Sequence, residues 1–266
     1  MKCRWLVQQS RIYNCGLGHR NPELFVKSQW FKKCFILWPT FWMLIHIAVL
    51  VFDVYNWYDY SDEDYQRWFV YPSRFNYLVL TVNAIFNFIF LSWVLLLNRS
   101  IVTGDEDYLP WYMKMTWFLS NCCGPAAFLA AIAFFLEEAS PHYSHIILSS
   151  VAMGYVILDT FISARPIRIF QVYQPMLYIV VYAAFTYADQ SSDNKPLYNF
   201  IDWSDPEATL SFFVPVLFVA VPILHTILFG IHQFRNAIPA YESSSSNVDF
   251  VNNGVKYSTS EEVVHF

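Results

Sequence analysis

Apolar residues along this chain gather in six long blocks, and most polar and charged residues fall between them. Each block is close to the roughly 20 residues that an α-helix needs to cross the hydrocarbon core of a bilayer. A helix that is apolar on all sides over this length is typical of a membrane span. The pattern predicts an all-α membrane protein, a bundle of six transmembrane helices. The blocks cover residues 34–52, 76–97, 111–136, 145–163, 166–188 and 209–231.

The composition agrees with this prediction. Apolar side chains make up 56% of the 266 residues and charged side chains only 14%, whereas soluble domains are about 25% charged. No spacing of cysteine and histidine resembles a zinc site, and the sequence predicts neither a metal nor a cofactor. We expect membrane lipids as partners and no nucleic acid.

The positive charges predict the orientation. If the N-terminus lies in the cytosol, only Arg67, Arg74 and Lys195 of the 16 Lys and Arg residues fall on the outer side. Positive charge near helix ends is retained on the cytoplasmic side, so we expect both termini to be cytoplasmic. The predicted organisation is a cytoplasmic N-terminal segment 1–33, a six-helix transmembrane domain 34–235, and a cytoplasmic tail 236–266. The tail is polar, without an apolar period, and is predicted to be disordered.

Polar residues recur at helical spacing inside two of the spans. Asn83 and Asn87 share a face with Ser73 in the second span, and Asp159 shares a face with His145 in the fourth. Polar groups in a span are costly unless they face the bundle interior. We therefore expect the two asparagines to form interhelical hydrogen bonds. We expect Asp159, about one turn from the inner surface, to form an ion pair with an arginine just beyond it.

Ser73 and His145 carry the candidate chemistry. The predicted topology places both at the outer end of a span, at the same depth. A hydroxyl and an imidazole within reach are the minimum parts for acyl transfer. Asp202, in the loop before the last block, lies on the same side. It either orients His145 as a third member or has a structural role.

The rest of that loop predicts the start of a helix. Ser204, followed three residues later by Glu207, fits a capping box with Ser204 as the N-cap. Pro206 falls in the first turn, where its missing N–H is tolerated.

Three stretches of the sequence resemble one protein family. They are "NPELFVKSQW" at 21–30, "ILDTFISARPIRIFQVYQPMLYIVVYAAFTY" at 157–187 and "PLYNFIDWSDPEA" at 196–208. Together they resemble the rolling stone family of multi-pass membrane proteins. The resemblance implies an integral membrane protein of the plasma membrane, with the endoplasmic reticulum as the alternative. It also implies a role in cell–cell (myoblast) fusion during muscle development.

More distantly, the architecture resembles the androgen-induced membrane protein family, whose members hydrolyse fatty acid esters of hydroxy fatty acids. Those enzymes use a threonine at the outer start of one helix and a histidine at the start of a later one. By position, the histidine corresponds to His145 and the threonine to Ser73. The implied alternative function is a membrane-embedded hydrolase that holds a long-chain lipid ester in an intrabundle cavity, in a tunnel between the second and fourth spans.

Overall fold

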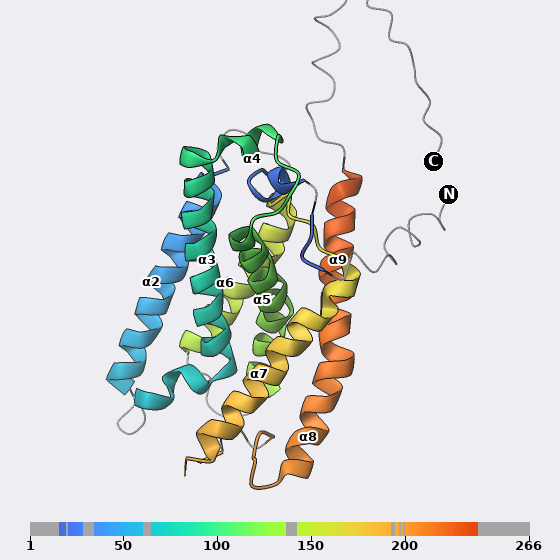
Figure 1. The fold of residues 1–266 in the computed structure, drawn as a ribbon. Helices are drawn as coiled ribbons and strands as arrows, with labels where there is room; N and C mark the ends of the chain where they lie inside the picture. Colours follow the sequence, from blue (N-terminus) through green and yellow to red (C-terminus); the bar gives the residue numbers. More distant parts are fainter. Residues whose placement is uncertain are drawn as a thin grey trace, which may run out of the picture.

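The computed structural model describes residues 16–19, 21–28, 35–60, 65–136, 143–192, 195–196, 198 and 200–238, and this part of the chain forms a bundle of helices (Figure 1). Most of the predicted cytoplasmic tail, residues 239–266, lies outside the described residues, as do residues 1–15. The elements in chain order are η2 (Pro22–Phe25), α2 (Leu37–Tyr60), η3 (Tyr65–Val70), α3 (Pro72–Leu97), α4 (Arg99–Thr103), α5 (Trp111–Leu136), α6 (Tyr143–Ile162), η4 (Ile169–Val172), α7 (Tyr173–Gln190), α8 (Pro206–Pro215), the π-helical turn η5 (Val216–Ala220) and α9 (Val221–Ala237).

Six segments of the described chain are long and apolar enough to cross a membrane, which confirms the predicted fold class. The first four are supplied by α2, α3, α5 and α6, the fifth by η4 with α7, and the sixth by α8, η5 and α9 together. The second span begins at Pro72 and the sixth runs over Pro206–Ala237, so both are longer than the apolar blocks indicate. The spans are Leu37–Trp57, Pro72–Leu97, Trp111–Ala133, His145–Ile162, Ile169–Gln190 and Pro206–Ala237.

Helix α5 lies at the centre of the bundle. It contacts α3, α6, α7 and α9 and is the most buried of the six spans. Gly124 allows the close approach of α9, because a Cβ atom at this position would lie only 2.8 Å from Leu228 Cδ1. Pro125 follows inside the same helix, which continues without interruption to Leu136.

The spans alternate in direction, so the bundle has two ends (Figure 1). One end holds the starts of α3 and α6 and the end of α7, and we call it the Ser73 end. The other holds the ends of α3 and α6 and the start of α5, and we call it the Arg165 end. Residues 16–19 and 21–28 pack on the Arg165 end. Ser28 Oγ donates to the Ile162 carbonyl at 2.7 Å, and Arg168 donates to the Gly16 carbonyl at 3.1 Å.

The sixth span is interrupted near its middle. Its α-helical hydrogen bonding changes to a π-helical turn at Val216–Ala220, flanked by Pro215 and Pro222. Each proline removes one backbone donor from the helix, and π turns inside helices are points where a helix bends. The two parts of this span are therefore joined by its weakest backbone segment.

The sixth span begins one residue later than the capping box predicts. Asp205, and not Ser204, is the N-cap residue: its Oδ1 accepts from the Ala208 N–H at 3.1 Å. Pro206 then takes the first helical position, where proline is favoured. The Ser204 hydroxyl instead accepts from Gln190 Nε2 at 3.1 Å. The predicted N-cap was wrong because both residues are good caps and only the backbone path selects between them.

This assignment of the cap predicts a difference between two neighbouring substitutions. Asp205→Ala removes the cap of the sixth span and is expected to lower the free energy of unfolding by about 1 kcal/mol. Ser204→Ala removes one exposed hydrogen bond and is expected to change it by less than half as much. Thermal unfolding of the purified protein in detergent measures both changes. An equal or larger effect of Ser204→Ala would return the capping role to Ser204.

Candidate functional site

Ser73 and His145 meet at the Ser73 end of the bundle. Ser73 Oγ lies 2.7 Å from His145 Nδ1, although 72 residues separate them in sequence. Ser73 is buried, with 6% of its surface exposed, and His145 is half-buried. In the tautomer that carries its proton on Nε2, Nδ1 accepts the hydroxyl hydrogen of Ser73. This is the arrangement of an activated hydroxyl nucleophile and its base.

The start of α3 adds backbone donors beside the serine. Tyr71 is the N-cap residue, and its side chain makes no capping hydrogen bond. Pro72 takes the first helical position, and the first bond of the helix runs from the Phe75 N–H to the Tyr71 carbonyl at 2.8 Å. The N–H groups of Ser73 and Arg74 therefore lie in the first turn, where no helical carbonyl accepts from them. Such N–H groups, together with the helix dipole, favour negative charge.

Tyr71 positions the histidine. Its ring lies 5.7 Å from the His145 ring at 64°, and 5.6 Å from the Trp57 ring at 63°. On another side it lies 6.1 Å from the Tyr198 ring. The imidazole is thus held against an aromatic wall that joins α2, α3 and the loop before the sixth span.

A buried ion pair underlies this wall. Arg74 Nε donates to Asp53 Oδ2 at 2.9 Å, and the two side chains are 1% and 0% exposed. Trp68 Nε1 donates to the same carboxylate oxygen at 2.7 Å, and the guanidinium carbon lies 4.1 Å from the centre of the Trp57 ring. The positive-inside pattern treats Arg74 only as a charge in an outer loop and misses this pair. The sequence did contain an indication of this ion pair, because Asp53 and Arg74 flank the loop that joins the first two spans.

Asp202 has the hydrogen bonds of a loop-capping residue. Its Oδ1 accepts from Gln190 Nε2 at 2.7 Å and from the Ser204 N–H at 2.9 Å, and its backbone N–H donates to Thr209 Oγ1 at 3.0 Å. The amide of Gln190, followed by the N–H of Ser204, holds the pKa of Asp202 below its ordinary value, so the carboxylate is ionised at neutral pH. These contacts join the end of α7 to the start of α8. They correspond to the structural role for Asp202, and not to the alternative in which it orients His145.

An apolar cavity of about 160 Å³ lies in the same half of the bundle. It is lined by α3, α5, α7, the loop before the sixth span, α8 and η5. The sequence predicts a tunnel between the second and fourth spans instead. In the structure, the space between α3 and α6 nearest to Ser73 is filled by a core cluster that includes Tyr77, Leu80, Leu148 and Ala152. The apolar space is found on the other side of α5.

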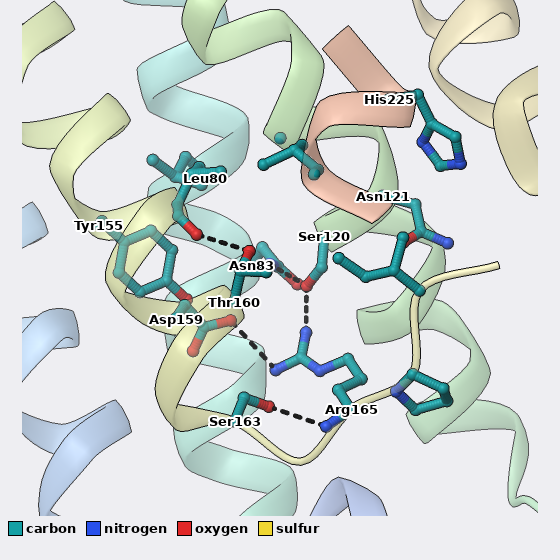
Figure 2. Close-up of a pocket in the computed structure, with 15 residues that line it drawn as sticks. Leu80, Asn83, Ser120, Asn121, Tyr155, Asp159, Thr160, Ser163, Arg165 and His225 are labelled. Carbon is teal, nitrogen blue, oxygen red and sulfur yellow. Dashed lines mark hydrogen bonds and ion pairs between the residues drawn. The ribbon is translucent and has the colours of Figure 1, made fainter. Parts of the chain in front are cut away.

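The predicted intramembrane polar residues Asn83 and Asp159 line a second cavity of about 50 Å³ toward the Arg165 end (Figure 2). Asn83 Nδ2 donates to Ser120 Oγ at 2.9 Å, which joins α3 to α5. Arg165 also donates to Ser120, and its Nη2 lies 3.5 Å from Asn87 Oδ1. Each of the two asparagines thus has a partner from a different segment of the bundle.

Asp159 lies at the wall of this cavity. Its Oδ2 is 3.8 Å from Arg165 Nη2, and its Oδ1 accepts from Trp38 Nε1 at 3.0 Å. The carboxylate therefore joins α6 to α2 and to the loop that follows α6. Both of its described contacts are with fixed groups of the fold, so its arrangement is that of a structural anchor.

The fold and these contacts define a multi-pass membrane protein with a partly buried hydroxyl–imidazole pair at one end of the bundle. Among the described residues, no three His, Cys, Asp or Glu side chains are grouped so that they can hold a metal ion. Comparisons of the chain with protein-family models, with curated proteins and with solved structures find no match.

Proposed function

We propose that this protein is a membrane-embedded hydrolase of lipid esters, with Ser73 as the nucleophile and His145 as the general base. The observation that carries the proposal is the 2.7 Å distance between Ser73 Oγ and His145 Nδ1. Within a span a polar pair of this kind is costly and marks a functional site unless it holds helices together. The proposal is further supported by the position of Ser73 in the first turn of a long helix.

The pair performs the reaction in two stages. His145 Nδ1 takes the hydroxyl proton of Ser73 as Oγ attacks the ester carbonyl carbon. The tetrahedral intermediate collapses, the bond to the alcohol oxygen breaks, and the alcohol leaves with the proton that His145 held. The acyl group remains on Ser73. A water molecule, deprotonated by the same imidazole, then attacks the acyl carbon and releases the carboxylic acid and the free serine.

The backbone of α3 stabilises the charge that develops. During each attack the carbonyl oxygen of the ester becomes an oxyanion, and N–H donors that are already in place before the reaction lower the energy of that oxyanion. The N–H groups of Ser73 and Arg74, at the positive end of α3, are the donors nearest to the nucleophile in sequence. The site lies at the end of a bundle of membrane-spanning helices, which favours a substrate that resides in the bilayer.

A fluorophosphonate probe tests the proposal directly, because it forms a covalent bond only with an activated hydroxyl. We expect the protein in phosphatidylcholine vesicles to be labelled on the peptide that contains Ser73, as identified by mass spectrometry. Labelling is expected to disappear in Ser73→Ala and in His145→Ala. Ser211→Ala serves as the matched control, because Ser211 is an exposed hydroxyl on α8 that bonds only to its own helix in the described structure. An unlabelled wild-type protein with an intact thermal transition would overturn the proposal.

We propose a role in cell–cell fusion at the plasma membrane as a second function, on the resemblance to the rolling stone family. In the described fold, the first and the third of the stretches that carry the resemblance each contact the second. The Lys27 carbonyl accepts from the Ala164 N–H at 3.2 Å, and Trp203 Nε1 donates to Thr186 Oγ1 at 3.1 Å. Removal of the protein from differentiating myoblasts is expected to reduce fusion. Rescue by Ser73→Ala would separate this role from hydrolysis, and unchanged fusion after removal would exclude it.

A further inference from the structure

The apolar cavity has the properties of a binding site for a hydrocarbon chain. Its wall is apolar except for Asn76, Tyr178 and Tyr182. The Tyr178 hydroxyl donates to Asn76 Oδ1 at 3.4 Å, and the Tyr182 hydroxyl donates to the Val70 carbonyl at 2.8 Å. Both hydroxyls are thereby used within the protein. Apolar cavities of this kind remain dry and take apolar ligands.

Three alanines on the central helix leave the space open. Ala126, Ala130 and Ala133 line the cavity and, with spacings of four and three residues, share one face of α5. Opposite them lie large side chains, among them Phe75 of α3 and Phe213 of α8. The volume of the cavity therefore depends on the small size of the alanine side chains.

The size of the cavity indicates how much chain it holds. A cavity of about 150 Å³ with an apolar lining binds benzene, and this one has about 160 Å³. It therefore accommodates about six carbon atoms. That is less than the long chain that the family resemblance implies.

The cavity reaches the first turn of α3, the turn that contains the nucleophile. Pro72, which precedes Ser73, and Asn76, one helical turn after it, both line the cavity. A chain attached to a carbonyl carbon at Ser73 Oγ therefore has apolar space within one turn of the same helix. This step rests on the function proposed for Ser73.

The cavity also has a route to the lipid-facing surface. Ile132, part of its wall, is 47% exposed. Val216 and Ala220 of the π-helical turn form another part of the wall. Immediately beside them, Phe218 and Val219 are 62% and 55% exposed. In a bilayer such exposed side chains contact lipid tails, so the ligand nearest to this wall is hydrocarbon.

We infer that this cavity binds the acyl chain of the ester substrate and that Ala130, with the alanines on its face, limits the length of that chain. The preferred acyl group has about six carbon atoms.

Binding is tested separately from hydrolysis. A hexanoic acid analogue that carries a photoreactive diazirine is incubated with Ser73→Ala in phosphatidylcholine vesicles, irradiated and located by mass spectrometry. We expect cross-links on α5 and on α8 with η5. Ala130→Phe places a six-carbon ring in a space of that size and is expected to reduce cross-linking at least about tenfold. Ala208→Leu, an enlargement at an exposed position on α8, is the matched control and is expected to leave it unchanged.

Chain-length preference is tested with the active protein. Wild type is expected to hydrolyse hexanoyl esters at least about tenfold faster than hexadecanoyl esters. Ala130→Phe, or Ala133→Leu if the first variant does not fold, is expected to move the preference to acetyl esters. An unchanged preference in an active, folded variant overturns this inference and leaves the proposed function standing. Cross-linking in the cavity without any hydrolysis by wild type would overturn the proposed function and leave the cavity as a binding site for a hydrocarbon chain. Cross-links confined to the outer surface would overturn the assignment of the cavity.

Discussion

Replacing Ser73 by alanine is expected to reduce the kcat of ester hydrolysis on the order of 10⁴-fold, with little loss of stability. The nucleophile is removed, and only the backbone donors at the start of α3 remain to assist attack by water. Because one neutral hydrogen bond is lost, the free energy of unfolding is expected to fall by about 1 kcal/mol. Steady-state hydrolysis in vesicles and thermal unfolding of the same preparation measure the two quantities.

The companion variants make this prediction specific. His145→Gln is expected to lose about as much activity as Ser73→Ala, and the double variant no more than either, because a nucleophile and its base act as a unit. Ser73→Thr keeps a hydroxyl and is expected to retain measurable activity. Multiplicative losses in the double variant would mean that the two side chains act independently, and the proposed pairing would then be wrong.

Replacing Arg74 by methionine is expected to destabilise the fold by about 3–5 kcal/mol, because it leaves the carboxylate of Asp53 buried without its charged partner. The two side chains are 1% and 0% exposed, so water does not replace the lost contact. Denaturant titration in detergent, followed by tryptophan fluorescence, measures the loss. Trp57 and Trp68 lie against this pair and report on its surroundings.

A double substitution separates a buried charge from lost packing. Asp53→Leu combined with Arg74→Met removes both charges and is expected to recover most of the stability. Arg67→Met provides the comparison, since Arg67 pairs with Asp189 at 2.8 Å but is 11% exposed. Arg67→Met is expected to lower the free energy of unfolding by less than Arg74→Met does. If the double variant is as unstable as the sum of its single variants, the ion pair is not what holds this end together.

The apolar pattern was sufficient to predict the fold, because the length of each block sets the number of spans and their order sets their direction. It was also sufficient to predict that Ser73 and His145 lie at the same depth. Depth does not determine rotation about a helix axis, and the 2.7 Å contact depends on that rotation. The contact therefore needed the packing of α3 against α6, which no local pattern encodes.

The features that the sequence did not predict all depend on contacts between distant segments. Arg74 is a loop charge by position, and only the packing of α2 beside α3 gives it Asp53 as a partner. The apolar cavity lies on another face of α5, because core side chains of α3 and α6 fill the space between these two helices nearest to Ser73. The cap of the sixth span moved to Asp205 because Ser204 bonds to Gln190 at the end of α7.

Residues 16–19 and 21–28 pack on the Arg165 end, and the loop at 200–205 packs on the end of α7. This packing bears on how relatives of this chain are to be recognised. These segments overlap the first and the third of the stretches that carry the resemblance, and their described contacts with the second stretch hold helices in place. Similarity in those stretches therefore indicates similar packing of helices. A similar reaction would instead be indicated by a hydroxyl residue at position 73 and a histidine at position 145. A search for proteins with the same chemistry should weigh those two positions above the longer and more conspicuous motifs.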